Sequence, residues 1–260
     1  MNVSIKLDRP CPVCNSTYTV AVQQVVGHRT GAAYLQFFCM DCRSFFHRTG
    51  YIESEQQKAS DFNELFQQRE NHGALQSQLL LELITRVPGT RSVLEVGHGV
   101  GLLLRACHDY GLAAVGFEVN ESCHKFAKNE LHVDSRLGFF DDSHGQKYDL
   151  IVALQVFEHL EQPRELFDLM RRHLNPDGAI YLSVPFVERN QWRFLWDANK
   201  LNPKHPADVF QHNDVHITNF SVDGMKQMGL GMGARIADYF VSKDVFANSP
   251  GAYQGVLFHF

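Results

Sequence analysis

The chain has 260 residues, of which 44% are hydrophobic, and a formal net charge of −5. This is enough for one large domain, or for an ordinary domain with a small appendage. No stretch approaches the roughly 18 consecutive apolar residues that span a bilayer, and residues 1–10 lack the apolar centre of a signal peptide. We therefore expect a cytoplasmic protein with no membrane partner. The acidic balance disfavours a dedicated nucleic-acid-binding protein.

Four of the six cysteines form two Cys-x-x-Cys pairs, which residues 15–38 separate. The four are Cys11, Cys14, Cys39 and Cys42. Two such pairs can present four thiolates tetrahedrally to zinc, and four thiolates leave no open position, so we expect a structural zinc ion. The interval is longer than the roughly 15 to 20 residues common in zinc ribbons, which predicts an extended hairpin between the pairs. Unligated thiols and an iron-sulfur cluster are the alternatives.

The surrounding residues 1–50 contain short alternating stretches and several phenylalanines, which indicates a small zinc-binding β module. We expect its aromatic side chains to form a small core, although this locally basic module could also contact a substrate. Residues 51–88 are rich in Glu, Gln and Leu with apolar spacings of three and four. They predict a helical linker that packs on the next domain.

Strands and helices alternate after Pro88 and Gly89, which predicts a mostly parallel sheet. The fold class is α/β, with a Rossmann-like seven-stranded sheet in residues 89–260 that carries helices on both faces, beside the N-terminal β module. The expected elements, in chain order, are a strand at 92–96, a helix at 102–110, a strand at 113–118, a helix at 121–130, strands at 132–136 and 148–154, a helix at 163–174, a strand at 178–184, a helix at 221–228, and strands at 234–240 and 255–260.

Three glycines, Gly97, Gly99 and Gly101, stand where the first strand turns into a helix, so a ligand can approach the backbone there. Glu118 follows at the end of the second strand, which is the place for an acid that hydrogen-bonds both ribose hydroxyls. These features predict an adenosine-binding site.

The third glycine position decides which nucleotide fits this site. A dinucleotide fingerprint needs glycine at position 102, and this chain has Leu102. Glu95 would be poorly placed beside phosphates but well placed near a cationic sulfonium-bearing amino acid. A sulfonium nucleoside therefore fits better than NAD.

The glycine turn with Glu95 and Glu118, together with the segment from Tyr148 to Leu160 that contains Glu158-His159-Leu160, resembles class I S-adenosylmethionine-dependent methyltransferases from about residue 75 onward. The resemblance implies that the glycine turn contacts the methionine part of S-adenosylmethionine, Glu118 the ribose, and residues 137–139 the adenine. The cofactor-binding residues it implies are Glu95, Gly97, Gly99, Gly101, Glu118, Val119, Gly138, Phe139 and Gln155.

His98 departs from the pattern, because many relatives have a smaller residue there. We expect its side chain to point outward from the turn and to leave room for the cofactor. A Rossmann-like domain that keeps the fold without binding the cofactor is the alternative.

Residues 186–220 form a long, aromatic segment that includes Trp192 and Trp196, which predicts a lid over the methyl acceptor. A small-molecule or glycan-type acceptor, methylated on oxygen or nitrogen, fits such a lid. Histidine is the natural base at neutral pH. The candidate catalytic residues are His216, His212 and His159.

Two other functions stay open. An RNA methyltransferase could dock through its zinc ribbon, but the acidic charge and the absence of an Asn-Pro-Pro-Tyr-type motif after the strand at 148–154 disfavour RNA as the partner. A zinc-ribbon adaptor could use the Rossmann-like domain only to recognise other proteins. The sequence leaves the oligomeric state open.

Overall fold

The computed structural model describes residues 10–26, 33–47, 55–187, 215–242 and 253–260, and these residues fall into two compact units. The unit that we call the cysteine unit comprises Met1–Tyr51, Phe157–Leu166 and Val184–Gly233. The other, which we call the Rossmann unit, comprises Ile52–Val156, Phe167–Ser183 and Ala234–Phe260. The division into residues 1–50, 51–88 and 89–260 stays a prediction.

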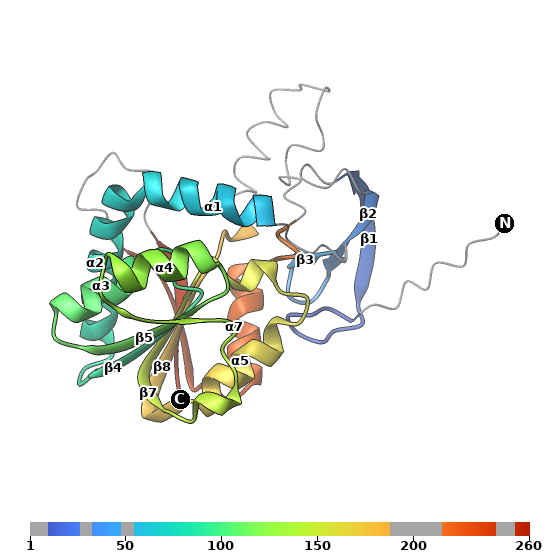
Figure 1. Ribbon diagram of the computed structural model, residues 1–260. Helices are drawn as coiled ribbons and strands as arrows, with labels where there is room; N and C mark the ends of the chain where they lie inside the picture. Colours follow the sequence, from blue (N-terminus) through green and yellow to red (C-terminus); the bar gives the residue numbers. More distant parts are fainter. Residues whose placement is uncertain (1–9, 27–32, 48–54, 188–214, 243–252) are drawn as a thin grey trace. The chain divides into compact units, whose positions relative to one another are not determined.

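The Rossmann unit contains a seven-stranded sheet with the order β10-β11-β8-β7-β4-β5-β6. Neighbouring strands from β8 to β6 are parallel, and β11 pairs antiparallel with β8 and β10. The expected seven-stranded, mostly parallel sheet is therefore confirmed (Figure 1). Its strands are β4 (Ser92–Val96), β5 (Ala113–Glu118), β6 (Asp134–Leu137), β7 (Tyr148–Leu154), β8 (Leu174–Ser183), β10 (Ile236–Val241) and β11 (Gln254–His259).

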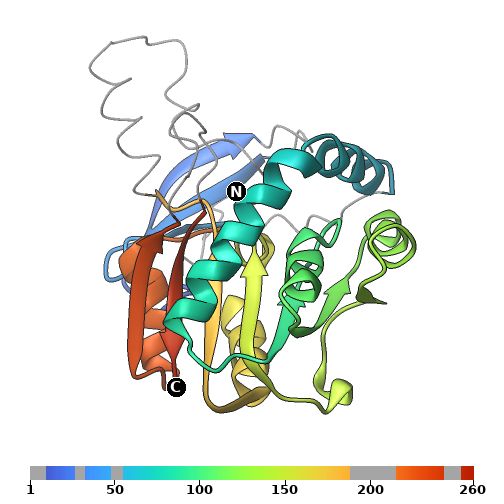
Figure 2. The same ribbon diagram turned by 90° about the vertical axis from the view of Figure 1, so that its left-hand side faces the viewer.

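Helices cover both faces of this sheet, as expected. On one face, Leu83 of α2 and Leu103 of α3 pack in the same buried cluster as Tyr181 of β8, and Figure 2 shows α2 lying across the sheet. On the other face, Phe167 of α5 contacts Phe258 of β11 at a ring distance of 5.1 Å. The helices are α1 (Glu55–Gln67), α2 (Arg69–Arg86), α3 (Leu102–Asp109), α4 (Glu121–Asn129) and α5 (Pro163–Arg172), with a short 3-10 helix η1 (Asp142–His144).

The cysteine unit is built on a four-stranded antiparallel sheet with the order β1-β2-β3-β9. β1 (Thr19–Val26) and β2 (Ala33–Cys39) form the extended hairpin that the cysteine spacing predicts. β3 (Phe45–Phe46) pairs with β9 (Thr218–Asn219), which lies far along the chain. The short helix η2 (Phe157–His159) and the helix α7 (Val222–Gly231) also belong to this unit.

Candidate functional site

The glycine turn after β4 has a backbone that only glycine adopts without cost. Gly97, Gly99 and Gly101 have φ angles of 72°, 55° and 82°. A Cβ atom on Gly97 would lie 2.5 Å from Cγ2 of Val156, and one on Gly101 would lie 2.8 Å from Cβ of Ala127. The turn is therefore held open by the absence of side chains, and it leads directly into the N-terminus of α3.

Glu118 ends β5 beside this turn, and its carboxylate is fixed by backbone donors. One oxygen accepts a hydrogen bond from the Gly99 N–H at 2.7 Å, and the other accepts one from the Asn120 N–H at 2.7 Å. Burial raises the pKa of Glu118, while these backbone donors act in the opposite direction. Each oxygen keeps a second lone pair, so the carboxylate can also accept hydrogen bonds from two hydroxyls.

Glu95 lies on the neighbouring strand β4 and is only 1% exposed. Its Oε2 atom has no hydrogen-bond partner among the described residues. Burial, and then the negative charge of Glu118, hold the pKa of Glu95 well above its usual range. Two buried carboxyls on adjacent strands form a site that a ligand with donors or positive charge stabilises.

Apolar side chains surround the next part of this edge. Val119, Leu137 and Phe139 are exposed, Phe139 to 83%. Gly138 has a φ angle of 122°, and its N–H donates to the carbonyl of Glu118 at 2.9 Å. Exposed apolar groups around a backbone turn of this kind suit the flat face of an aromatic base.

Gln155 follows β7 and is a non-glycine residue in the left-handed region, with a φ angle of 56°. Its backbone N–H donates to the carbonyl of Ser183 at 2.8 Å, which holds this costly conformation. The expected cofactor residues thus all lie in the Rossmann unit at or beside the carboxyl ends of β7, β4, β5 and β6. Three strand spacings of about 4.8 Å give an edge of about 14 Å, which can take an extended adenosine joined to an amino acid.

The expected outward orientation of the His98 side chain is wrong. Its side chain is 4% exposed, and its Nε2 atom lies 2.7 Å from the hydroxyl of Ser135, which also lies 2.7 Å from Nδ1 of His124. The ring fits because residue 116 is glycine, where a Cβ would lie 2.7 Å from Cδ2 of His98. Burial lowers the pKa of His98 to about 4. The side chain is therefore part of the core under the turn and leaves the ligand side free.

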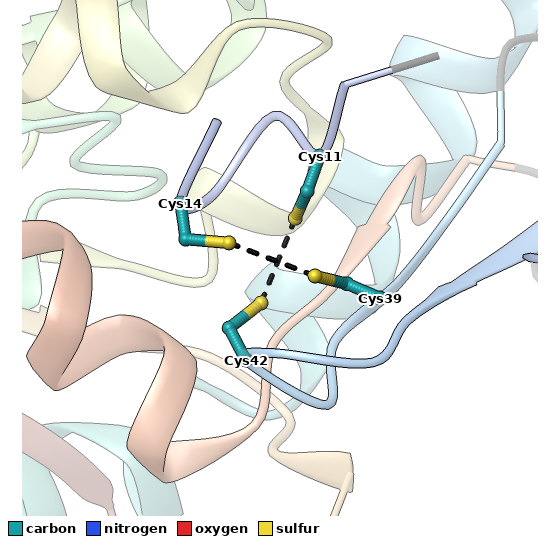
Figure 3. Close-up of side chains that lie close together, drawn as sticks. All are labelled: Cys11, Cys14, Cys39 and Cys42. Atoms are coloured by element: carbon teal, nitrogen blue, oxygen red, sulfur yellow. Dashed lines mark hydrogen bonds between the residues drawn. The ribbon is translucent and has the colours of Figure 1, made fainter. Parts of the chain in front are cut away.

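The four cysteines converge on one point in the cysteine unit (Figure 3). The Sγ atoms of Cys11 and Cys42 are 3.5 Å apart, and those of Cys14 and Cys39 are 3.6 Å apart. A tetrahedral zinc site with Zn–S bonds of about 2.3 Å places sulfurs about 3.8 Å apart. The hydrogen bond between the two thiols lowers the pKa of Cys42 and raises the pKa of Cys11. A divalent cation would let all four ionise together, so this set fits zinc.

A second group of metal-binding side chains lies in the same unit, in Glu158, His159 and His216. One potential ligand atom from each lies within 4.8 Å of the others, and the two imidazole rings are 5.0 Å apart. Two of the predicted catalytic histidines are thus brought together. Glu158 was expected only as part of the Glu158-His159-Leu160 motif, because its burial beside the two histidines depends on the fold and leaves no signal in the sequence.

The two ends of the predicted lid, residues 186–220, lie next to each other, because the N–H of Val187 donates to the carbonyl of Phe220 at 2.8 Å. Both ends are buried, at Phe186 and Val187 and at Ile217 and Phe220. His212, Trp192 and Trp196 lie outside the described residues. The role of the segment as a lid stays a prediction.

Comparison with known proteins identifies the family of this chain. A family model described as a methyltransferase domain matches residues 57–236, which is well over half of the sequence. The chain belongs to this family, and its domain is an S-adenosylmethionine-dependent methyltransferase domain.

Individual relatives are distant. A ubiquinone biosynthesis O-methyltransferase of Actinobacillus pleuropneumoniae is 29% identical over 106 residues, which are 36% of this chain and 45% of the relative. The plantazolicin methyltransferase BpumL, solved with SAH (S-adenosylhomocysteine), has a TM-score of 0.55 at 15% identity, and the match covers 78% of this chain and 89% of that one. The magnesium protoporphyrin IX methyltransferase of Synechocystis PCC 6803, also with SAH, has a TM-score of 0.52 at 16% identity, with 82% and 90% covered.

These structural likenesses establish the fold, and the chain spans about half or less of the length of the curated relatives it matches. Among the described residues, the helices are too short or too polar for any of them to cross a membrane.

Proposed function

We propose that the protein transfers the methyl group of S-adenosylmethionine to an oxygen of a small molecule. The observation that carries this proposal is the buried pair Glu95 and Glu118 beside the glycine turn. In the proposed complex, Glu118 accepts the ribose hydroxyls and Glu95 faces the cationic amino-acid end of the cofactor. Phe139, with Val119 and Gly138, borders the adenine.

The reaction itself is an in-line displacement at the methyl carbon. The acceptor oxygen forms a bond to that carbon, the carbon–sulfur bond breaks, and its electron pair stays on sulfur. The enzyme has to align the two reactants and remove the hydroxyl proton. Our candidates for receiving this proton are His216 first, then His159 and His212.

The preference for oxygen comes from the relatives, since several curated ones carry the name ubiquinone biosynthesis O-methyltransferase. A small-molecule or glycan-type acceptor also suits the aromatic composition of residues 186–220. Methyl transfer to a nitrogen of such an acceptor is the alternative to oxygen. The acidic net charge makes RNA a less favoured acceptor than these. A cytoplasmic location is part of this proposal.

We further propose that the four cysteines hold one structural zinc ion. Four thiolates complete its coordination, so the metal takes no part in methyl transfer and stabilises the β2–β3 region on either side of Cys39 and Cys42. Metal analysis of protein purified without chelator should then give at least one zinc per chain. A content well below one equivalent would exclude the four-thiolate site.

The experiment that tests the function is incubation with methyl-labelled S-adenosylmethionine and cell extract, followed by separation into RNA, protein and small-molecule or glycan fractions. Label in the small-molecule or glycan fraction supports the proposal. Nuclease-sensitive label would assign the acceptor to RNA, and no label above that of a Glu118→Gln control would contradict methyl transfer.

A further inference from the structure

The group of Glu158, His159 and His216 contains a buried acid that has no hydrogen-bond partner among the described residues. Glu158 is 1% exposed, and neither carboxylate oxygen has a hydrogen-bond partner among the described residues. A carboxyl group left in this state costs several kcal/mol of desolvation, so buried acids in proteins are normally hydrogen-bonded, paired or bound to a metal ion.

The two histidines provide the nitrogen ligands that such an ion would need. Nδ1 of His159 lies 2.9 Å from the carbonyl oxygen of Val215, so Nδ1 carries the proton and Nε2 carries the lone pair. A backbone carbonyl on the far nitrogen is the usual support of a metal-bound histidine. His216 stands one residue after Val215, and its carbonyl accepts a hydrogen bond from the Asn219 side chain at 3.2 Å.

The scaffold that carries the three side chains is fixed independently of them. The hydroxyl of Thr218 donates to the carbonyl of Leu160 at 3.0 Å, which ties the end of η2 to the start of β9. Burial differs across the group: Glu158 is buried, His216 is half-buried and His159 is exposed. Solvent therefore reaches one side, where a metal ion would keep open positions for water or a ligand.

We propose that Glu158, His159 and His216 bind one divalent transition-metal ion such as Zn²⁺, separate from the ion at the cysteines. Two imidazoles and one carboxylate suit zinc and iron better than magnesium or calcium, which prefer oxygen ligands throughout. The attraction between the Glu158 carboxylate and the cation would offset the cost of desolvating this buried acid. Three protein ligands leave at least one coordination position open, which distinguishes this site from the closed four-thiolate one.

The role of this ion rests on the proposed function. Glu158 follows the proposed cofactor residue Gln155 by three positions, so their Cα atoms lie within about 10 Å of each other. A hydroxyl bound to the ion would release its proton to water more easily, and the resulting oxygen anion would attack the methyl carbon while sulfur keeps the electron pair. In that case His159 and His216 act as ligands, and the proton goes to solvent.

The test is a calorimetric titration of the full chain with Zn²⁺, after a mild chelator has removed loosely bound metal and left the cysteine zinc in place. We expect one further equivalent to bind. Glu158→Gln and His216→Asn should each weaken this step by at least about tenfold. The matched controls Glu121→Gln and His108→Asn change exposed residues in the Rossmann unit and should bind like the parent chain. His159→Asn, at an exposed position, is the reserve variant if Glu158→Gln does not fold.

The outcomes separate this inference from the proposed function. No further equivalent in the parent chain, or equal binding in the parent and the Glu158 and His216 variants, overturns the metal site. Binding of S-adenosylhomocysteine is measured on the same samples. If it is present while the second zinc is absent, the methyltransferase proposal stands and the metal site falls. If the second zinc binds while the cofactor product does not, the methyltransferase proposal falls and the metal site stands.

Discussion

The residue with the clearest consequence for stability is His98, a neutral histidine buried beside Ser135. Its pKa is about 4 in the folded chain, below the usual 6.5, so the unfolded chain binds more protons between these two values. The free energy of unfolding therefore carries no penalty from His98 above pH 6.5, and it decreases as the pH falls from 6.5 towards 4. A shift of this size corresponds to roughly 3 kcal/mol.

Urea unfolding measured from pH 4 to 7 tests this directly. His98→Asn should show a shallower loss of unfolding free energy at low pH than the parent chain, by up to about 1.4 kcal/mol per pH unit. His108→Asn, at an exposed histidine, should follow the parent chain. An unchanged slope in His98→Asn would show that the buried imidazole does not titrate as described.

The glycine turn makes a second prediction at the residue scale. Gly101→Ala combines a φ angle of 82° with a Cβ contact of 2.8 Å to Ala127, whereas Gly111→Ala combines a similar φ angle of 72° with open space. We expect Gly111→Ala to cost about 1 to 2 kcal/mol of unfolding free energy, and Gly101→Ala to cost about 1 to 3 kcal/mol more because of the clash. Equal costs in urea unfolding would contradict the crowding at Gly101.

At the scale of elements, the N-terminus of α7 is joined to the second cysteine pair. The Ser221 hydroxyl caps α7 by accepting from the Gly224 N–H at 2.8 Å, and it also donates to the carbonyl of Cys42. Ser221→Ala should cost about 1 kcal/mol and accelerate release of the cysteine-bound zinc to a chelator.

Asn120→Ala provides the matched control for Ser221→Ala. Asn120 caps α4 in the Rossmann unit, where its side chain accepts from Ser122 and Cys123 N–H groups. This variant should lose a similar free energy of unfolding and release zinc at the parent rate. Equal rates of zinc release in Ser221→Ala and the parent would show that the cap does not support the metal site.

The elements of the Rossmann unit could be predicted from the sequence because their signals are local. β4, β5 and β7 begin and end at the predicted residues, since buried parallel strands are continuous apolar runs bounded by turns. The strand β9 could not be predicted, because it has two residues and exists only through pairing with Phe45 and Phe46.

The candidate site divides in the same way. The position of Glu118 beside the glycine turn could be predicted, because both lie at the ends of strands that the local sequence predicts. Their role in binding the cofactor stays a proposal. The burial of His98 could not be predicted, because it depends on Gly116 and Ser135 from two other strands. The grouping of Glu158 and His159 with His216 could not be predicted either, because it joins residues more than 50 positions apart.

At the scale of the whole molecule, the chain should contain two metal ions that differ in exchange. The cysteine zinc is closed and the proposed Glu158–His159–His216 ion is open, so a mild chelator should remove only the second. Under the proposed role, this treatment should lower the rate of methyl transfer while leaving the affinity for S-adenosylhomocysteine unchanged. If the chelator does not change the rate of methyl transfer, the ion has no role in the reaction, and His159 or His216 remains the candidate that accepts the proton.

The central claim is that the glycine turn and the two buried acids bind S-adenosylmethionine. Titration calorimetry of the parent chain and Glu118→Gln with S-adenosylhomocysteine tests it most directly. We predict one binding site per chain in the parent and a loss of roughly tenfold to a hundredfold in affinity in Glu118→Gln, because hydrogen bonds from the ribose to a charged acceptor are weakened. No heat with the parent chain at high protein concentration, or equal affinity in both proteins, would contradict the account.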